Sequence, residues 1–289
     1  MKAHPYAVFV VTLLRSLIWT RLYSSSMPFT PTHIAAALPI AWLCRWQVPF
    51  TALVCGTVVV DVGVFFPFLL DYRATHSISG IFTHCVPIGL LLYYTYHLLL
   101  KRPFVDLLPL SARNKLLPFV NRDIDFSLTR IALVAALIAV GAATHVFWDS
   151  FTHPNRWGVR TFPILQTELA EVKGWPIHLH LVLQHGSSVL ILPPLITGFA
   201  LWVRRQEPQP TNDNRLRVKP WIPWAVIGLM IACGVAYMTW FQITHPHMLW
   251  WVHSFRRAVK DTGAAFIVVA LIYCAVMHYY WYKNGQGAN

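Results

Sequence analysis

Long apolar runs separated by short polar stretches dominate the chain. Seven of them follow Met27, at about residues 34–48, 51–70, 79–100, 128–150, 181–203, 221–241 and 263–282. A helix needs roughly 20 apolar residues to cross a hydrocarbon core of about 30 Å, and several runs meet that length. The pattern predicts an all-α fold, a polytopic transmembrane helix bundle. The first run is short and contains Pro39, so we expect it to be a partial or tilted span.

The composition supports this interpretation. Hydrophobic residues make up 56% of the 289 residues, charged residues only 12%, and the mean hydropathy is +0.50. A soluble domain normally has about 25% charged residues. The 5 cysteines are scattered singly, mostly inside apolar runs, and form no CxxC pair. They predict small buried side chains, with neither a disulfide framework nor a zinc knuckle.

The formal net charge of +12 comes from Lys and Arg residues that lie mainly between the apolar runs. The basic connections 101–127 and 204–220 and the C-terminal tail alternate with 71–78, 151–180 and 242–262. Basic loops face the cytoplasm, beside anionic lipid, so the first set is predicted to be cytoplasmic. The loop 242–262 weakens this contrast because it contains Arg256, Arg257 and Lys260. No basic stretch is interleaved with aromatics, so membrane lipids and not nucleic acid are the expected partners.

The chain divides by composition into four parts. Residues 1–26 contain an apolar stretch broken by Arg15, which is either a poor signal-anchor or an extension before a start at Met27. Residues 27–203 form the predicted membrane core, and 204–220 a cytoplasmic linker with a polar, Pro-containing centre. Residues 221–289 form a C-terminal helix pair.

Asp61 is the first candidate for chemistry, because it interrupts the apolar run VVVDVGVFF. Ionisable residues inside spans are costly and usually face the protein interior. A buried lone carboxylate would be protonated, whereas a bound cation would keep it ionised. The alternatives are a proton relay or a helix-packing role.

Further His and Asp residues fall on the same predicted outer side of the membrane. They are His33, Asp71, His76, His84, His145, Asp149, His153 and His185. His145, Asp149 and His153 follow one another at intervals of four, so a helix would project them from one face. Imidazole and carboxylate are ligands of zinc and related divalent metals, and such a metal activates water and polarises phosphoryl oxygens. The alternative for His145 with Asp149 is a purely structural pair.

The remaining histidines have other interpretations. His84, His97 and His278 are expected to be hydrogen-bonded core or interface residues. His178 and His180 are either ligands or interfacial residues. The loop that contains His245, His247 and His253 is rich in Trp, which indicates a membrane-interface anchor.

Three segments carry a family resemblance: MPFTPTHIAAALPI from Met27, DYRATHSISG from Asp71, and THVFWDSFTHPNRWG from Thr144. Together they resemble an uncharacterised bacterial family of integral membrane proteins, domain of unknown function 4184. The order of His and Asp residues also distantly resembles the membrane-bound metal-dependent hydrolases and, beyond them, zinc-dependent phospholipase C and the P1-type nucleases. That resemblance implies metal ligands at His33, Asp61, His76, His145, Asp149 and His185.

The sequence departs from the soluble enzymes at two places. They use an N-terminal Trp amine as a ligand, which this chain does not offer. They also end with a His-x-x-x-Glu pair, whereas His185 is followed four residues on by Val189, and His180 by Gln184. One or two metal ions are therefore expected instead of three. Glu168 and Glu171 are candidates for a missing carboxylate.

These observations predict a metal-dependent hydrolase of the bacterial inner membrane that acts on a phosphoester from the outer leaflet, with lipid-linked phosphoesters among the candidate substrates. The predicted cofactor is a divalent metal, zinc first, held by His33, Asp61, His145, Asp149 and His185. His76 and His153 are predicted as ligands or general acids. The alternatives are an ion or proton transporter that uses Asp61 and a non-catalytic metal-binding membrane protein. The almost purely apolar cytoplasmic halves of the spans favour a one-sided site.

Overall fold

A computed structural model describes residues 30–66, 70–120, 124–172, 175–208, 218–219, 221–244 and 250–285. The predictions for residues 1–26, for the centre of the linker 204–220 and for His245 and His247 lie outside these ranges. The chain forms two compact units: one contains Phe147–Leu190, and the other Pro31–Val146 with the residues from Ile191 onward. Each unit is described by itself.

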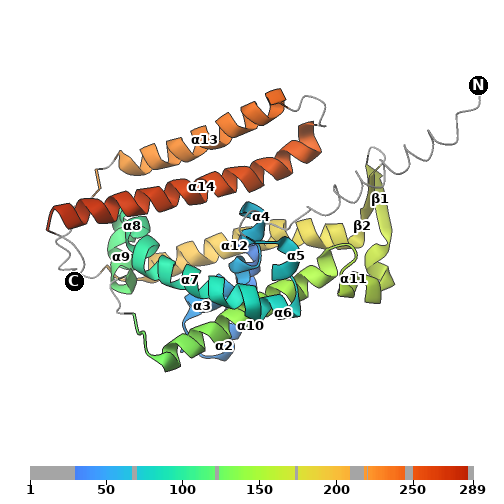
Figure 1. Ribbon diagram of the computed structural model, residues 1–289, viewed down its shortest axis with the longest axis horizontal. Coiled ribbons are helices and arrows are strands. Elements are labelled where there is room, and N and C mark those ends of the chain that lie inside the picture. Colours follow the sequence, from blue (N-terminus) through green and yellow to red (C-terminus); the bar gives the residue numbers. More distant parts are fainter. Residues whose placement is uncertain are drawn as a thin grey trace, which may run out of the picture. The chain divides into compact units, whose positions relative to one another are not determined.

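The regular secondary structure in the described part of the larger unit is all helical. Its N-terminal half contains η1 (Thr30–Ala36), α2 (Ala37–Leu43), α3 (Phe50–Val59), α4 (Val62–Phe65), α5 (Tyr72–Thr75), α6 (Ile78–Gly80), η2 (Ile81–Cys85), α7 (Val86–Thr95), η3 (Tyr96–Leu100), α8 (Lys101–Asp106) and α9 (Leu110–Val120). The helix α10 (Leu128–Thr152) begins in this unit, and α13 (Ile222–Thr244) and α14 (Trp250–Lys283) end it. The two last helices run side by side (Figure 1).

The smaller unit contains the only described strands. After the end of α10 it continues with α11 (Trp157–Thr161), η4 (Pro163–Gln166), β1 (Glu168–Val172), β2 (Trp175–His178) and the first residues of α12 (Leu179–Arg205). The strands pair antiparallel, with Ala170 opposite Ile177. Asn155 adopts a left-handed backbone with φ of 64° in the turn that follows α10, a conformation that Asn tolerates. The all-α prediction therefore holds for the bundle and misses this hairpin in the loop 151–180.

Four described helical stretches are long and apolar enough to cross a membrane. They are Ile78–Asp106, Leu128–Thr161, Leu179–Arg205 and Thr262–Lys283. The first of these joins α6 to α8 through the π-helical turns η2 and η3. They match four of the seven predicted segments, so the structure contains apolar helices of spanning length, and the number seven is not confirmed.

The other predicted segments are shorter as helices. The run 34–48 stops at α2, where Arg45 and Trp46 take left-handed backbone conformations and the Trp46 amide returns to the Ala41 carbonyl at 2.8 Å. The run 51–70 breaks into α3 and α4, with Asp61 between them. The apolar part of α13 covers Ile222–Tyr237.

Two glycines bring α3 and α10 into backbone contact. A Cβ on Gly141 would meet the Leu53 carbonyl oxygen, and it would lie 3.0 Å from the Cα of Gly56. A Cβ on Gly56 would likewise meet the Ile138 carbonyl oxygen. Small residues at such crossings let membrane helices pack closely. Around them Leu53, Ile138 and their neighbours form a buried apolar core.

Gly141→Ala is expected to lower the stability of the protein by about 1–3 kcal/mol, because the added methyl group overpacks this crossing. Gly198→Ala is the matched control, since nothing lies within 4 Å of a Cβ at that position. There the loss of backbone freedom in the unfolded chain should stabilise α12 by up to about 1 kcal/mol. Thermal unfolding in detergent measures both variants, and equal stability of the two would contradict the close crossing.

Candidate metal centre

Asp61, His76 and His145 gather at one point of the larger unit, although they come from three different segments. Their exposed fractions are 1%, 3% and 1%. One ligand atom from each lies within 4.8 Å of the others. Buried ionisable side chains are costly unless they are hydrogen-bonded, paired with an opposite charge or bound to a metal ion.

The α3–α10 crossing positions His145. It follows Gly141 by one helical turn, and Thr57 follows Gly56 directly. The His145 Nδ1 atom lies 2.7 Å from the Thr57 carbonyl oxygen. A carbonyl only accepts hydrogen bonds, so Nδ1 carries the proton and donates it. The other ring nitrogen, Nε2, lies 3.6 Å from Asp61 Oδ1.

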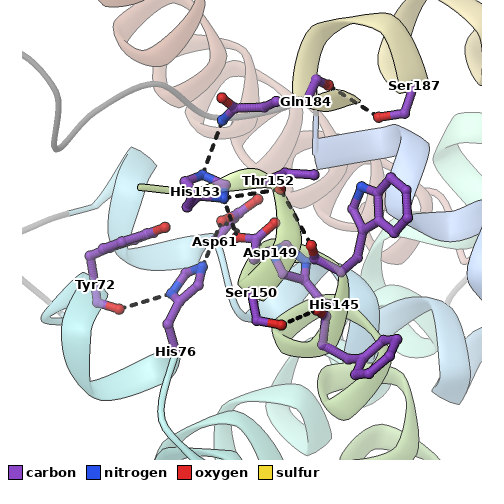
Figure 2. Close-up of polar contacts among 12 residues, drawn as sticks. Asp61, Tyr72, His76, His145, Asp149, Ser150, Thr152, His153, Gln184 and Ser187 are labelled. Atoms are coloured by element: carbon purple, nitrogen blue, oxygen red, sulfur yellow. Dashed lines mark hydrogen bonds and ion pairs between the residues drawn. The ribbon is translucent and has the colours of Figure 1, made fainter. Parts of the chain in front are cut away.

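A tightly capped turn positions His76. Asp71 accepts the Arg73 amide at 3.1 Å, and Ser77 Oγ accepts the Gly80 amide at 2.9 Å. His76 Nδ1 donates to the Tyr72 carbonyl oxygen at 2.8 Å, and its Nε2 points at Asp61 Oδ1 from 3.6 Å (Figure 2). A Cβ on Gly80 would meet the Ala74 carbonyl oxygen, so only glycine fits where the backbone at residue 80 passes close to residue 74.

Asp61 itself lies where α3 gives way to α4. Its backbone is no longer helical, with φ of −91° and ψ of 0°. This is the sparsely occupied bridge region in which many functional residues are found. The break turns the carboxylate toward His76 and His145, as the two distances of 3.6 Å record.

The two imidazoles share a pattern. Each gives its Nδ1–H to a main-chain carbonyl and turns the Nε2 lone pair toward the same carboxylate oxygen. Metal-ligating histidines typically fix their tautomer in this way. A separation of 3.6 Å is too long for a hydrogen bond. It is close to the roughly 3.4 Å between two ligands of one tetrahedral zinc ion with bonds of about 2.0–2.1 Å.

His33 lies beside this group. It belongs to η1, and its ring stacks on the His145 ring with centroids 3.7 Å apart and planes 10° apart. Both rings are buried. Of the predicted site residues, the larger unit therefore brings together His33, Asp61, His76 and His145.

The smaller unit holds a second polar group around His153. Its Nδ1 lies 3.6 Å from Asp149 Oδ2 and 3.2 Å from the Thr152 hydroxyl, and the Gln184 amide donates to its Nε2 at 3.1 Å (Figure 2). All four side chains are buried. Because α10 is continuous, Asp149 lies one turn beyond His145 and His153 two turns beyond it, on one helix face.

One family model matches residues 27–276. The chain belongs to this family, Domain of unknown function (DUF4184). Every candidate residue of the two groups lies inside the matched DUF4184 region. No curated protein and no solved structure matches the chain. The resemblance to metal-dependent hydrolases is thus a prediction that these comparisons do not test.

Within the DUF4184 region, α12 buries His180, which the sequence left open between ligand and interfacial residue, and not the predicted ligand His185. His185 is exposed, whereas His180 and Gln184 are buried four residues apart. His180 Nδ1 donates to the Leu165 carbonyl oxygen at 2.9 Å, as His76 and His145 do to theirs. No described residue hydrogen-bonds its Nε2. The His-x-x-x-Gln spacing was the available signal, because residues four apart share a helix face.

The other candidates have ordinary partners. His84 contacts the Thr83 hydroxyl at 2.7 Å, His97 the Thr51 hydroxyl at 2.9 Å, and His278 the Leu99 carbonyl at 3.0 Å. His178 bonds the Gln166 carbonyl at 2.9 Å within the hairpin region. Glu168 and Glu171 lie exposed on β1, so neither supplies a buried carboxylate.

Proposed function

We propose that the protein is a membrane-embedded, metal-dependent hydrolase that cleaves a phosphoester from the outer leaflet of the bacterial inner membrane, with lipid-linked phosphoesters among its candidate substrates. One observation carries the proposal. Two buried imidazoles, each with its Nδ1–H held by a main-chain carbonyl, turn their Nε2 atoms to one oxygen of the buried Asp61. This arrangement favours a bound cation over a proton relay, because hydrogen-bonded relays need shorter contacts.

The donor set fits a divalent metal of the zinc type. Two neutral imidazoles and one carboxylate are typical catalytic zinc ligands, and Asp61, His76 and His145 would hold the ion. His33 and Asp149 are the candidates for further ligands, since each is buried and adjoins His145 by ring stacking or by one helical turn. The ion would supply a lowered pKa of bound water and a polarised phosphoryl oxygen.

His153 is the candidate general acid, and His76 is better explained as a ligand. The Gln184 amide and the Thr152 hydroxyl orient the His153 ring, and Asp149 Oδ2 lies 3.6 Å from its Nδ1. The proton on His153 Nδ1 would pass to the leaving oxygen as the P–O bond breaks. His185, which is exposed, is not included in the proposed site.

The charge pattern supports an outer-face site. His76 lies just before the span Ile78–Asp106, and Lys101 and Arg102 lie in its last turns. These residues thus mark opposite ends of one membrane-crossing stretch. Basic residues mark the cytoplasmic end, so the His76 end belongs to the outer side in the proposed topology.

The decisive experiment uses the full chain purified in mild detergent and reconstituted into vesicles. We expect hydrolysis of a phosphodiester or phospholipid that is abolished by chelation and restored by zinc or manganese. Chelation should also lower the melting temperature, because a ligand at 100 times its Kd stabilises a protein by about 2.7 kcal/mol. Metal binding without turnover of any phosphoester would support the non-catalytic alternative instead, and absence of metal would contradict the proposal.

Ion transport is the second candidate, and the interruption between α3 and α4 favours it. Discontinuous helices often form the ion sites of transporters, and Asp61 lies at this break. Vesicles that contain the protein would then show proton or metal flux that Asp61→Asn stops. Flux without hydrolysis would select this alternative, whereas hydrolysis without flux would exclude it.

A further inference from the structure

Four aromatic rings gather on the surface of the smaller unit. Phe147 and Phe151 lie one turn apart at the end of α10, with ring centroids 5.0 Å apart. The Phe151 ring also lies 5.8 Å from the Trp157 ring and 5.9 Å from the Phe162 ring. Ring pairs at such distances attract one another. Because Phe147, Trp157 and Phe162 are nonetheless exposed, this aromatic cluster is a surface and not a core.

A glycine brings the two halves of the aromatic cluster together. A Cβ on Gly158 would lie 2.7 Å from the Ser150 carbonyl oxygen and 2.8 Å from the Phe151 ring. Glycine therefore allows the start of α11 to return to the end of α10. The return places Trp157, at the first position of α11, beside Phe151.

The aromatic cluster continues an apolar stripe along α10. Residues three and four apart share a helix face. One such row of this single helix is exposed and wholly apolar: Leu133, Ala136, Val140, Ala143 and Phe147. The buried positions of the same helix include His145 and Asp149. A helix that buries its ionisable residues and exposes an apolar row is suited to contact with lipid and not with water.

The position of the aromatic cluster indicates the boundary between acyl chains and headgroups. The cluster lies at the C-terminal end of the apolar stretch Leu128–Thr161, which is long enough to cross a membrane. Aromatic rings, Trp above all, are enriched at this level of the bilayer. Continuity with a stripe of spanning length favours lipid over a soluble partner protein.

A guanidinium group lies beside the aromatic rings. Arg160 is exposed three residues after Trp157, and its Nε donates to the Asn155 carbonyl oxygen at 2.7 Å. This bond limits the positions that the side chain can take. Arg has five N–H donors in a planar fork that suits phosphate oxygens, so a headgroup phosphate fits this place.

We propose that the aromatic cluster seats the smaller unit in the phospholipid surface of the leaflet at the C-terminal end of α10, with Arg160 on a headgroup phosphate. The rings of Trp157 and Phe162 enter the level between headgroups and acyl chains, so α11 lies in the membrane surface and does not project into water. Arg160 favours anionic phosphatidylglycerol over zwitterionic phosphatidylcholine. This seating is independent of the metal centre and of the proposed hydrolysis.

Fluorine NMR of the full chain, labelled with fluorinated tryptophan and reconstituted into lipid nanodiscs, tests the proposal. The Trp157 signal is the one that Trp157→Phe removes, and this conservative change at an exposed position should leave the protein folded. We expect a phospholipid with a nitroxide near the headgroup end of its acyl chain to broaden this signal most strongly. A nitroxide at the terminal methyl group and a water-soluble gadolinium chelate should each broaden it less.

The other outcomes of this measurement contradict the proposal. Stronger broadening by the chelate would place Trp157 in water, and stronger broadening by the terminal nitroxide would place it in the centre of the bilayer. No broadening by any of the three probes would mean that protein covers the aromatic cluster.

Arg160→Gln tests the phosphate contact. Phosphatidylglycerol added to phosphatidylcholine nanodiscs should shift the Trp157 signal of the parent, and the variant should lose most of this shift. Arg160→Lys should retain part of it because it keeps the charge without the planar fork. Arg73→Gln is the control, since Arg73 is also exposed but lies outside the smaller unit. An equal shift in Arg160→Gln and the parent, or the same shift from inorganic phosphate alone, would overturn the assignment of Arg160 to a lipid.

Discussion

Asp61→Asn and His145→Gln are each expected to remove the bound metal from the purified protein. Both substitutions nearly preserve side-chain volume, so the buried packing should survive. Loss of a second-shell partner alone costs about 10–100-fold in metal affinity, and loss of a ligand should cost more. Elemental mass spectrometry of the parent should show stoichiometric zinc or manganese, with background levels in each variant.

Two matched variants control this prediction. Asp71→Asn changes an exposed carboxylate at the cap of α5, where the amide oxygen still accepts the Arg73 amide. His84→Gln changes a half-buried histidine of η2 whose Nδ1 lies 2.7 Å from the Thr83 hydroxyl. Both should retain full metal. Equal metal content in Asp61→Asn and the parent would exclude Asp61 as a ligand and would leave the hydrolase proposal without its centre.

The second large effect is expected at His153. His153→Gln should lower kcat for a phosphoester with an alkyl leaving group by about 10²–10⁴, the usual contribution of a general acid. The metal content should stay unchanged, because the proposed ligands Asp61, His76 and His145 are intact. A nitrophenyl leaving group needs no proton, so its hydrolysis should lose far less.

This contrast between leaving groups distinguishes proton transfer from a structural role. A variant that merely distorts the smaller unit would slow both substrates equally. His178→Gln is the matched control, since His178 lies in the same unit and bonds the Gln166 carbonyl on the hairpin side. Equal losses for the two substrates would contradict the assignment of His153 as the acid.

The candidate residues were recognisable because their signals are local. Asp61 stands out since a charged residue in the run VVVDVGVFF is costly in a membrane. His145, Asp149 and His153 share a helix face because they recur every four residues. The choice of His185 rested on a distant resemblance, and the structure buries His180 and Gln184 instead. The spacing of residues along α12 shows which side chains share a helix face, but it does not show which face is buried.

The sequence by itself determined that the chain belongs to the DUF4184 family, that it is mainly helical with apolar segments long enough to span a membrane, and that His and Asp residues lie near the ends of several of these segments. The length of an apolar segment, its hydropathy and the spacing of His and Asp residues along it are properties of the segment alone. They do not depend on how the segments pack against one another. Only the tertiary structure decided that α3 ends before Asp61, that Gly56 and Gly141 let α10 approach Thr57, and that His76 and His145 share one carboxylate. It also decided that Arg102 and Arg113 share Asp106. These features depend on contacts between segments that are far apart in the sequence. The crossing of α3 and α10, for example, places the Thr57 carbonyl against His145 and so sets the orientation and tautomer of that ring.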